Sequence, residues 1–282
     1  MFIDTLIESI DFSYRYNEAP EAALKGITLE VKKGDFVAVV GANGAGKSTL
    51  CSALAGLIPN YFIGYTKGVI KIDGKKTTEC GVGELSQTVG LVFQNPFNQL
   101  SYTADTVSEE LAFGLGNRGL PKEIMLEKIN NVAETVQIND LLDRNPLELS
   151  GGQVQRVALA AAIILEPKVL VLDECTTQLD PIGSEQIMKT VKRLNQNGMT
   201  IIMVDHDMEK VAGLANRVIV LQDGKLVLND SPENVFSNPK IVEYGIAAPD
   251  YYELTKDYAL NSVILTEEQA IKKLEEVLAD EN

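Results

Sequence analysis

The chain has 282 residues, 45% of them hydrophobic, with a formal net charge of −15 and a pI near 4.6. This length suits one large or two small domains with a proper core, and the acidic balance argues against a nucleic-acid partner, because nucleic acids attract basic surfaces. No stretch approaches the roughly 18 apolar residues of a membrane span, and the N-terminus lacks the basic start and apolar core of a signal peptide. We therefore expect a cytoplasmic chain that reaches a membrane only through a partner.

The first segments alternate apolar and polar residues. Residues 7–14 and 27–31 follow this period of two, which predicts antiparallel strands with one face toward solvent. Two aromatic residues, Tyr14 and Tyr16, end the first segment. A ring at this place could stack on the π face of an adenine base or could pack in the core, and the sequence leaves both open.

A phosphate-binding loop is the strongest feature of the sequence. Residues 36–40 read as a buried strand, the next residues are GANGAGKST, and residues 50–57 read as a helix. The loop fits G-x-x-x-x-G-K-[ST], whose glycines let backbone N–H groups surround an anion at a helix N-terminus. The alternative, a glycine-rich turn that ends in Lys-Ser by chance, is disfavoured by these flanks. The predicted nucleotide ligands are Gly41, Asn43, Gly44, Ala45, Gly46, Lys47, Ser48 and Thr49, with Lys47 on the β- and γ-phosphates and Ser48 on Mg²⁺.

The middle of the chain changes character. Strands are predicted at residues 68–74 and 88–93, and Gln94 follows the second strand directly. Residues 107–142 have helical apolar spacing and look like an insertion into an α/β core. The sequence LSGGQ, residues 149–153, then opens another helix. Its glycines favour a second phosphate cradle and an ordinary serine-capped helix start about equally.

Two acids end the next predicted strand. Residues 168–174 form an apolar run that finishes with Asp173 and Glu174. Beside a phosphate loop, Asp173 suits Mg²⁺ binding and Glu174 suits polarising a water molecule, although paired acids can also simply cap the next element. A helix at 183–194 and a strand at 199–204 lead to His206, the single histidine. It is either a packed or solvated residue or a donor to the γ-phosphate.

The C-terminal region completes the core and then extends beyond it. Residues 218–228 predict a hairpin that turns at Asp223-Gly224, and residues 232–236 predict a short helix. A capping box, Thr266 to Gln269, starts a last helix. Its apolar face must pack on something, and it consists of Ile271, Leu274, Val277 and Leu278.

The ordered set GANGAGKST, Gln94, LSGGQ, VLVLDE, Asp180 and His206 resembles the nucleotide-binding subunit of an ATP-binding cassette (ABC) transporter over about residues 4–238. The resemblance implies an α/β fold: a P-loop NTPase cassette with a RecA-like core, an antiparallel β subdomain, a helical subdomain at about residues 95–165 and a small C-terminal α-helical extension. The cassette would cover residues 1–238. Residues 239–282 would form the extension, a dimerisation element.

In that family two ATP molecules lie between two subunits, each held by the P-loop of one and the LSGGQ of the other. The resemblance therefore implies that the signature acts in trans, through Ser150, Gly151, Gly152 and Gln153. It also implies that Tyr14 stacks on adenine, that Asp180 crosses the dimer interface, and that Ser48, Gln94 and Asp173 hold the Mg²⁺ ion. Glu174 would be the catalytic base, Gln94 would sense Mg²⁺ and the attacking water, and His206 would be the switch histidine. Cys175 replaces a common proline, and Gln178 replaces a small residue, beside the expected interface.

A narrower resemblance lies in FQNPFNQL, residues 93–100, in ELAFG, residues 110–114, and in the tail EYGIAAPDYYEL. These resemble the ATPases of energy-coupling-factor (ECF) importers, which take up vitamins or transition-metal ions. The resemblance implies a MgATP-hydrolysing subunit on the cytoplasmic face of the membrane. Its partners would be a second ABC ATPase, identical or paralogous, an integral membrane scaffold and a small substrate-binding membrane protein. The alternative is a soluble ABC ATPase, for example in iron–sulfur cluster assembly.

Overall fold

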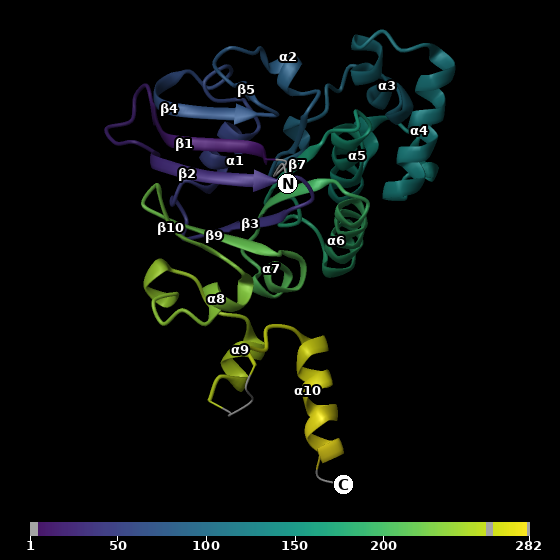
Figure 1. The fold of residues 1–282 in the computed structure, drawn as a ribbon. Coiled ribbons are helices and arrows are strands. Elements are labelled where there is room, and N and C mark those ends of the chain that lie inside the picture. The colour runs from purple at the N-terminus through teal and green to yellow at the C-terminus, as the bar shows by residue number, and fades with distance from the viewer. Residues whose placement is uncertain (1–4, 258–261, 281–282) are drawn as a thin grey trace.

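Two β-sheets stacked around one helix form the body of the protein (Figure 1). The structure is a computed structural model that describes residues 5–257 and 262–280. The smaller sheet is antiparallel and has the order β2-β1-β4-β5. Alternating residues of β1 and β2 point into the core, as predicted. The strands are β1 (Thr5–Tyr16), β2 (Leu24–Lys32), β4 (Gly64–Ile72) and β5 (Lys75–Lys76).

The larger sheet has six strands in the order β10-β9-β3-β8-β7-β6, and all neighbours are parallel except the β9–β10 hairpin. Strands β3, β7 and β8 are buried along their whole length, which explains their continuous apolar sequences, because a covered parallel sheet has no wet face. The strands are β3 (Phe36–Val40), β6 (Val89–Val92), β7 (Val169–Asp173), β8 (Thr200–Val204), β9 (Arg217–Gln222) and β10 (Lys225–Asp230).

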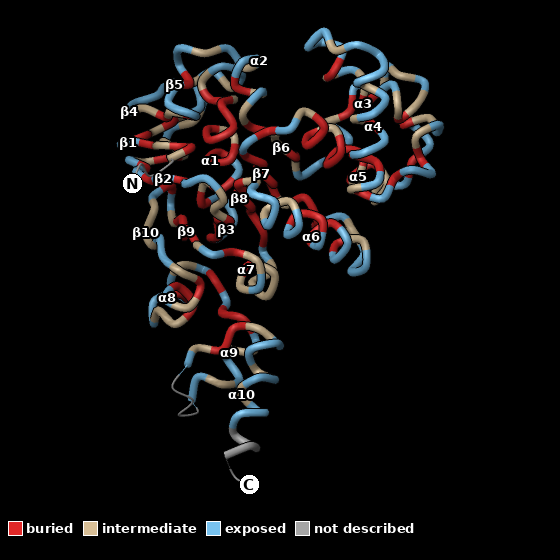
Figure 2. Tube along the Cα trace, turned by 45° about the vertical axis from the view of Figure 1, so that its right-hand side comes forward, coloured by how far each residue is buried: buried red, intermediate tan, exposed pale blue. Residues whose placement is uncertain are grey.

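Helices cover both faces of the larger sheet. Helix α1 (Lys47–Leu54) lies between the two sheets, where Leu50 and Leu54 share a core cluster with residues of both. The other face packs on a second cluster that includes α5 and α6, and the buried positions run along these elements in Figure 2. The remaining helices before the hairpin are α2 (Val82–Leu85), α3 (Val107–Asn117), α4 (Lys122–Val136), α5 (Gly151–Ile163), α6 (Pro181–Gln196) and α7 (Met208–Leu214), with 3-10 turns η1 (Pro96–Asn98), η2 (Asn139–Leu141) and η3 (Pro146–Glu148).

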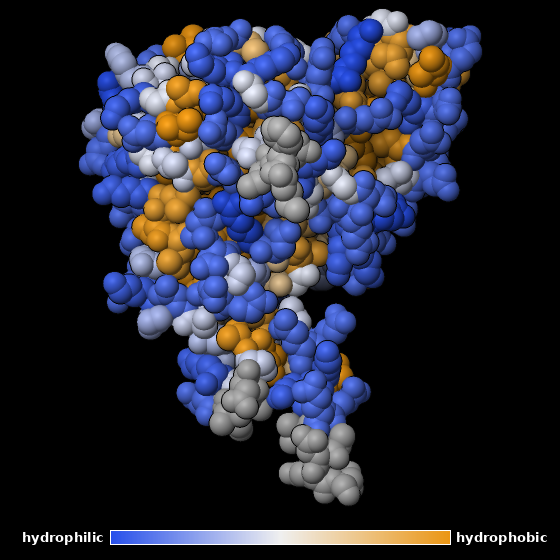
Figure 3. All heavy atoms as spheres, in the orientation of Figure 1, coloured by the Kyte–Doolittle hydropathy of each residue, from blue (hydrophilic) through white to orange (hydrophobic). Residues whose placement is uncertain are grey.

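Helices α3, α4 and α5 stand together at one side of the larger sheet (Figure 1). Apolar side chains remain exposed on this helical group and on the turn η1 that leads to it. Orange residues gather over the α3–α4 end in Figure 3, and the exposed apolar side chains include Phe97, Phe113, Ile124 and Leu126. Among the described residues, no helix is long and apolar enough to cross a membrane.

The C-terminal segment projects from the end of the body that carries β9 and α7 (Figure 1). It consists of α8 (Pro232–Phe236), η4 (Val242–Tyr244), α9 (Asp250–Thr255) and α10 (Glu267–Asp280). Ile241, Ile246 and Leu265 are buried in the same cluster as the larger sheet, so the segment continues the core of the cassette. On α10, Ile271 and Leu274 are 51% and 61% exposed. The side chains of Val277 and Leu278 lie outside the described residues.

Most predicted elements are confirmed, including the hairpin at Asp223-Gly224 and the capping box, in which Gln269 N donates to Thr266 Oγ1 at 3.3 Å. The main differences are boundaries. Helix α1 begins at Lys47 and ends at Leu54, rather than covering residues 50–57, because Gly46 is its N-cap and Gly56 adopts φ +76° just beyond it. Strand β4 begins at Gly64 and not at residue 68, since it follows β1 as far as Tyr16.

Candidate functional site

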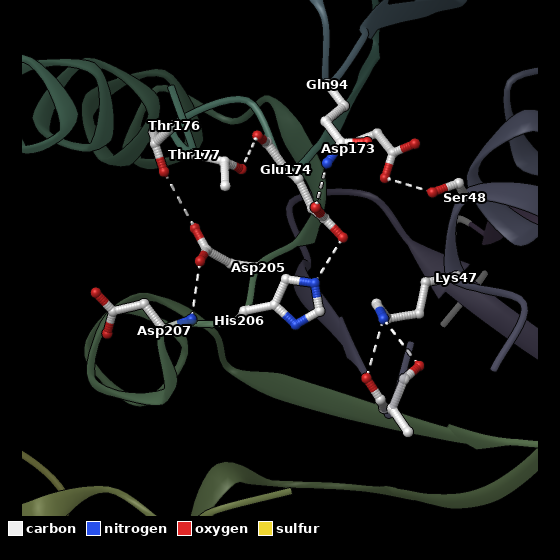
Figure 4. Close-up of polar contacts among 12 residues, drawn as sticks. Lys47, Ser48, Gln94, Asp173, Glu174, Thr176, Thr177, Asp205, His206 and Asp207 are labelled. Atoms are coloured by element: carbon white, nitrogen blue, oxygen red, sulfur yellow. Dashed lines mark hydrogen bonds and ion pairs between the residues drawn. The ribbon is translucent and has the colours of Figure 1, made fainter. Parts of the chain in front are cut away.

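The candidate site follows from the order of the parallel strands. Four neighbours, β3, β8, β7 and β6, end at the same edge of the sheet, and the chain leaves them at the P-loop, His206, Glu174 and Gln94 respectively. The carboxyl edge of a parallel sheet is where α/β proteins bind ligands. Residues separated by more than 100 positions in the sequence therefore meet at one place (Figure 4).

The P-loop needs its glycines for two physical reasons. Gly41, Gly44 and Gly46 adopt φ of +149°, +81° and +104°, a region that favours glycine. A Cβ on Gly41 would lie 2.3 Å from the Leu221 carbonyl oxygen, and one on Gly46 would lie 2.7 Å from the Ala23 oxygen. The glycines are therefore needed both for their positive φ angles and because a side chain would collide with neighbouring backbone. Within the loop, Asn43, Gly44 and Ser48 are exposed to solvent, while Ala45 and Thr49 are buried.

Lys47 is folded back onto the loop that carries it. Its Nζ donates to the carbonyl oxygens of Gly41 at 2.9 Å and Ala42 at 3.1 Å, and the residue is only 6% exposed. Burial lowers the pKa of Lys47, and the negative charges of Glu174 and Asp173 oppose this shift. A partly desolvated cation with few water contacts is well suited to bind a phosphate oxygen.

Two oxygen ligands lie side by side next to Lys47. Ser48 Oγ donates to Asp173 Oδ1 at 3.1 Å. Burial raises the pKa of Asp173; the Ser48 hydrogen bond opposes this, and the neighbouring Glu174 adds to it. Two of the predicted metal ligands, Ser48 in the first turn of α1 and Asp173 at the end of β7, are thus brought together.

Glu174 is held by two side chains. Gln94 Nε2 donates to Glu174 Oε2 at 2.7 Å, and His206 Nε2 lies 2.7 Å from Glu174 Oε1 (Figure 4). The main chain of Glu174 adopts φ +49°, an uncommon conformation for a non-glycine residue, and its N–H donates to Val204 O at 3.1 Å. The three residues predicted to be catalytic therefore form one chain of contacts, Gln94–Glu174–His206.

A further acid supports this chain of contacts. Asp205 is 8% exposed, and its carboxylate accepts from the amide of Asp207 at 2.9 Å and from Thr176 Oγ1 at 3.4 Å. Asp207 in turn caps α7, accepting from the amides of Glu209 and Lys210. Sequence reasoning did not select Asp205. The sequence contains a signal for it, because Asp-His-Asp directly follows a buried strand, and carboxylates at such a place need hydrogen-bond donors.

The assignment of Tyr14 to adenine stacking is wrong. Tyr14 is 0% exposed, and its hydroxyl donates to Phe62 O at 3.1 Å. Its ring covers Gly64, where a Cβ would lie 2.6 Å from the ring. Tyr14 shares the inward face of β1 with Phe12, as strand alternation requires. Tyr16, by contrast, is 38% exposed, and its hydroxyl lies 3.1 Å from Thr49 Oγ1 at the end of the P-loop.

The signature sequence forms a second, separate site. Ser150 is the N-cap residue of α5, where Gln153 Oε1 accepts from the Ser150 amide at 2.9 Å. The signature and the segment around Asp180 line a cavity of about 420 Å³. Asp180 caps α6, accepting from the Gly183 amide at 2.6 Å. Among the described residues, no hydrogen bond joins the signature to the P-loop.

This arrangement can position a triphosphate and activate water. The loop amides and Lys47 provide an anion site, and the carboxylate of Glu174 lies beside it with both oxygens already oriented. Cys175, which follows Glu174, is buried, and its burial raises the pKa of its thiol to about 12, so it supplies packing and no nucleophile.

Comparison with known proteins agrees with this geometry. The model of the ABC transporter family matches residues 24–177. The ECF transporter ATP-binding protein EcfA1 of Halalkalibacterium halodurans is 44% identical over 97% of this chain and 95% of its own length, and that of Bacillus subtilis is 41% identical over 95% of both. The structure of CbiO1 from Clostridium perfringens, part of an ABC transporter complex, has a TM-score of 0.73 at 34% identity, covering 85% of this chain and 94% of its own.

A second solved structure is a dimeric ATP-binding cassette in a post-hydrolysis state with ADP and Pi. It has a TM-score of 0.71 at 28% identity over 80% of this chain and 98% of its own. The α/β cassette fold and the ATPase activity predicted from the sequence are confirmed, and the ECF reading is supported over the soluble alternative. The chain belongs to the ABC transporter family, as an ATP-binding and ATP-hydrolysing subunit of the energy-coupling-factor type.

Proposed function

We propose that this chain hydrolyses MgATP with Glu174 as the general base and so drives import through a membrane scaffold. The observation that carries the proposal is the position of Glu174: it lies between Gln94 and His206 and directly follows Asp173, the partner of Ser48. A water molecule held against Glu174 would face the last phosphate of a nucleotide in the P-loop. Gln94 and His206 would then orient the carboxylate while it takes the proton.

The residues fit magnesium. Mg²⁺ binds oxygen ligands at about 2.1 Å in an octahedron, so two adjacent ligands stand about 3.0 Å apart. Ser48 Oγ and Asp173 Oδ1 are 3.1 Å apart, and the Oε1 of Gln94 remains available because its Nε2 donates to Glu174. Ser48, Asp173 and Gln94 would therefore hold the ion, directly or through water, together with phosphate oxygens. The ion would supply charge neutralisation on those oxygens.

The separation of the two sites supports a dimer. The signature residues and Asp180 line their own cavity and share no hydrogen bond with the P-loop among the described residues. A second cassette, identical or paralogous, would bring its signature over this P-loop and would receive Ser150, Gly151, Gly152 and Gln153 of this chain over its own nucleotide. Asp180 would then cross the interface. The base of the nucleotide would stack on Tyr16.

The domain division and the membrane partners belong to the same proposal. The cassette covers residues 1–238, with the helical subdomain at about 95–165, and residues 239–282 form an extension that strengthens the dimer. An exposed apolar surface at Phe97 and Phe113, 47% and 59% exposed, offers a docking place for an integral membrane scaffold at the cytoplasmic face. Through that scaffold, a small substrate-binding membrane protein would receive the energy to import a vitamin or a transition-metal ion.

The test is mass spectrometry of what co-purifies with a tagged chain from detergent-solubilised membranes of its native host. We expect a stoichiometric integral scaffold with a small hydrophobic companion, and the companion would point to the cargo. A second ABC ATPase in the mixture would establish a heterodimer. Purification with soluble partners only would overturn the importer proposal and leave the ATPase assignment in place.

A further inference from the structure

The C-terminal segment touches the wall of the ATP site at the P-loop. Gly245 follows the turn η4 with φ +73°, and a Cβ there would lie 3.1 Å from the Cβ of Ala42. Ala42 is the second residue of the P-loop, and its carbonyl accepts from Lys47 Nζ. Gln222 Nε2 donates to Glu243 O at 3.3 Å and ties the turn to the end of β9. The turn is therefore fixed against the backbone that must wrap the phosphates.

The same segment holds the helix that follows the switch histidine. The amide of Asp250, the first residue of α9, donates to the carboxylate of Glu209 in the first turn of α7. At the other end of α7, a Cβ on Gly213 would lie 3.9 Å from the methyl group of Thr266, just before α10. Helix α7 begins two residues after His206. The extension therefore lies against both ends of α7.

We propose that Gly245 and Glu209 are positioning residues, through which the C-terminal segment sets the geometry of the ATP site. Gly245 acts on nucleotide affinity, because only a residue without a side chain leaves room for Ala42 and the P-loop. Glu209 acts on turnover, because it holds the helix that directs His206 toward Glu174. Neither residue is placed in contact with the reacting groups. The segment is also anchored in the core of the cassette by Ile246 and Leu265, which are 5% and 1% exposed, so a displacement of the segment would reach the closely packed core.

The P-loop contact is tested in the full chain with Gly245→Ala. The added methyl group would lie 3.1 Å from the Cβ of Ala42 and crowd it, so we expect the Kd for ATP to rise roughly tenfold with kcat little changed, because overpacking displaces the neighbouring backbone. Gly119→Ala is the matched control, because Gly119 has a similar φ of +69° and nothing within 4 Å of its Cβ position. It carries the same backbone strain without the contact.

A second substitution separates this effect from general damage. Ala42→Gly removes the atom that the new methyl group meets, so the pair Gly245→Ala/Ala42→Gly should bind ATP within about twofold of Ala42→Gly alone, the coupling expected of residues in direct contact. The proposal for Gly245 is overturned if Gly245→Ala and Gly119→Ala bind ATP equally well. It is also overturned if Gly245→Ala weakens ATP binding by the same factor in the Ala42→Gly background as in the wild-type chain.

The α7 contact is tested with Glu209→Ala and Glu209→Gln. Glutamine keeps the acceptor for the Asp250 amide, whereas alanine removes it, so we expect kcat to fall severalfold in the alanine variant and to recover in the glutamine variant, with the Kd for ATP unchanged in both. Glu109→Ala removes the same kind of bond, to the Asp105 amide at 3.0 Å, at the start of α3 and serves as control. An unchanged kcat in Glu209→Ala, with or without a lower Tm, would assign Glu209 a structural role only.

Discussion

At the scale of single residues, the central feature of the site is how Glu174 is held. Its two carboxylate oxygens are each 2.7 Å from a nitrogen, of Gln94 on one side and His206 on the other. These contacts come from the ends of three neighbouring strands, β6, β7 and β8, so the sheet itself sets the orientation of Glu174. Such an arrangement requires little reorganisation when water and nucleotide bind.

Replacing Glu174 separates binding from chemistry. Glu174→Gln keeps the size of the side chain and one acceptor oxygen but cannot accept a proton, so we expect kcat to fall by roughly 10²–10⁴-fold, the range of general-base catalysis. The Kd for ATP should stay within about twofold of the wild-type value, because the substitution leaves the contacts that bind ATP before the reaction unchanged. Steady-state hydrolysis and equilibrium nucleotide binding measure the two effects. Hydrolysis at the wild-type rate would remove Glu174 from the role of base.

The two tyrosines at the end of β1 have different roles, which substitution can distinguish. Tyr16→Ala should weaken ATP binding by the 1–3 kcal/mol, about 5- to 150-fold, that loss of base stacking costs, and Tyr16→Phe should restore most of it. Tyr14→Phe should leave ATP binding unchanged and destabilise the fold by about 1 kcal/mol, the usual cost of one buried hydrogen bond. Nucleotide titration and denaturant unfolding measure these outcomes. Unchanged ATP binding in Tyr16→Ala would remove Tyr16 from the stacking role.

At the scale of elements, α10 has an apolar face that no other described part of the chain covers. Ile271 and Leu274 are exposed, and the helix is separated from the larger sheet by α7 and α9. If this face is buried by the extension of a second subunit, Ile271→Gln/Leu274→Gln should weaken the dimer by roughly tenfold or more, because each buried aliphatic side chain contributes about 1.5–3 kcal/mol.

The control for α10 is Lys272→Gln/Glu276→Gln, which changes two exposed residues of the same helix and leaves the net charge unaltered. Analytical ultracentrifugation over a range of protein concentrations gives the dissociation constants. Equal dissociation constants for the two double variants would show that α10 has no part in dimerisation.

The sequence predicts some elements well for identifiable reasons. Strands β3, β7 and β8 are buried on both faces, so their apolar runs are unambiguous, and the P-loop spacing admits one geometry. The roles of Tyr14 and Tyr16 are harder to predict, because alternation places both residues on the inward face of β1. They differ only in that Tyr16 pairs with Gly64 at the end of the sheet, which the sequence does not reveal. The contacts of Gly245 and Glu209 are set by tertiary packing between distant segments, which no local pattern encodes.

At the scale of the whole molecule, this chain contains all parts of an ATPase site but does not bring them together by itself. Lys47, Asp173 and Glu174 lie at one place, whereas Ser150 and Asp180 line a different cavity. In the proposed dimer, a second subunit would supply its signature and complete the site. Communication between subunits would then follow from geometry, because closing the dimer completes both sites at once.

The central claim, a site composed of two subunits with Glu174 as its base, is tested most directly by mixing two inactive variants. Ser150→Arg places bulk and charge in the signature and should abolish hydrolysis while leaving nucleotide binding by the monomer intact. Glu174→Gln removes the base. The experiment requires that the wild-type chain hydrolyses ATP without a paralogous partner, which is measured first. The ATPase rate of the mixture is then compared with the rate of each variant by itself. In a mixed dimer one site combines the intact P-loop and base of Ser150→Arg with the intact signature of Glu174→Gln, so we predict that activity returns. A mixture as inactive as its components, with mixed dimers shown to form, would contradict the claim.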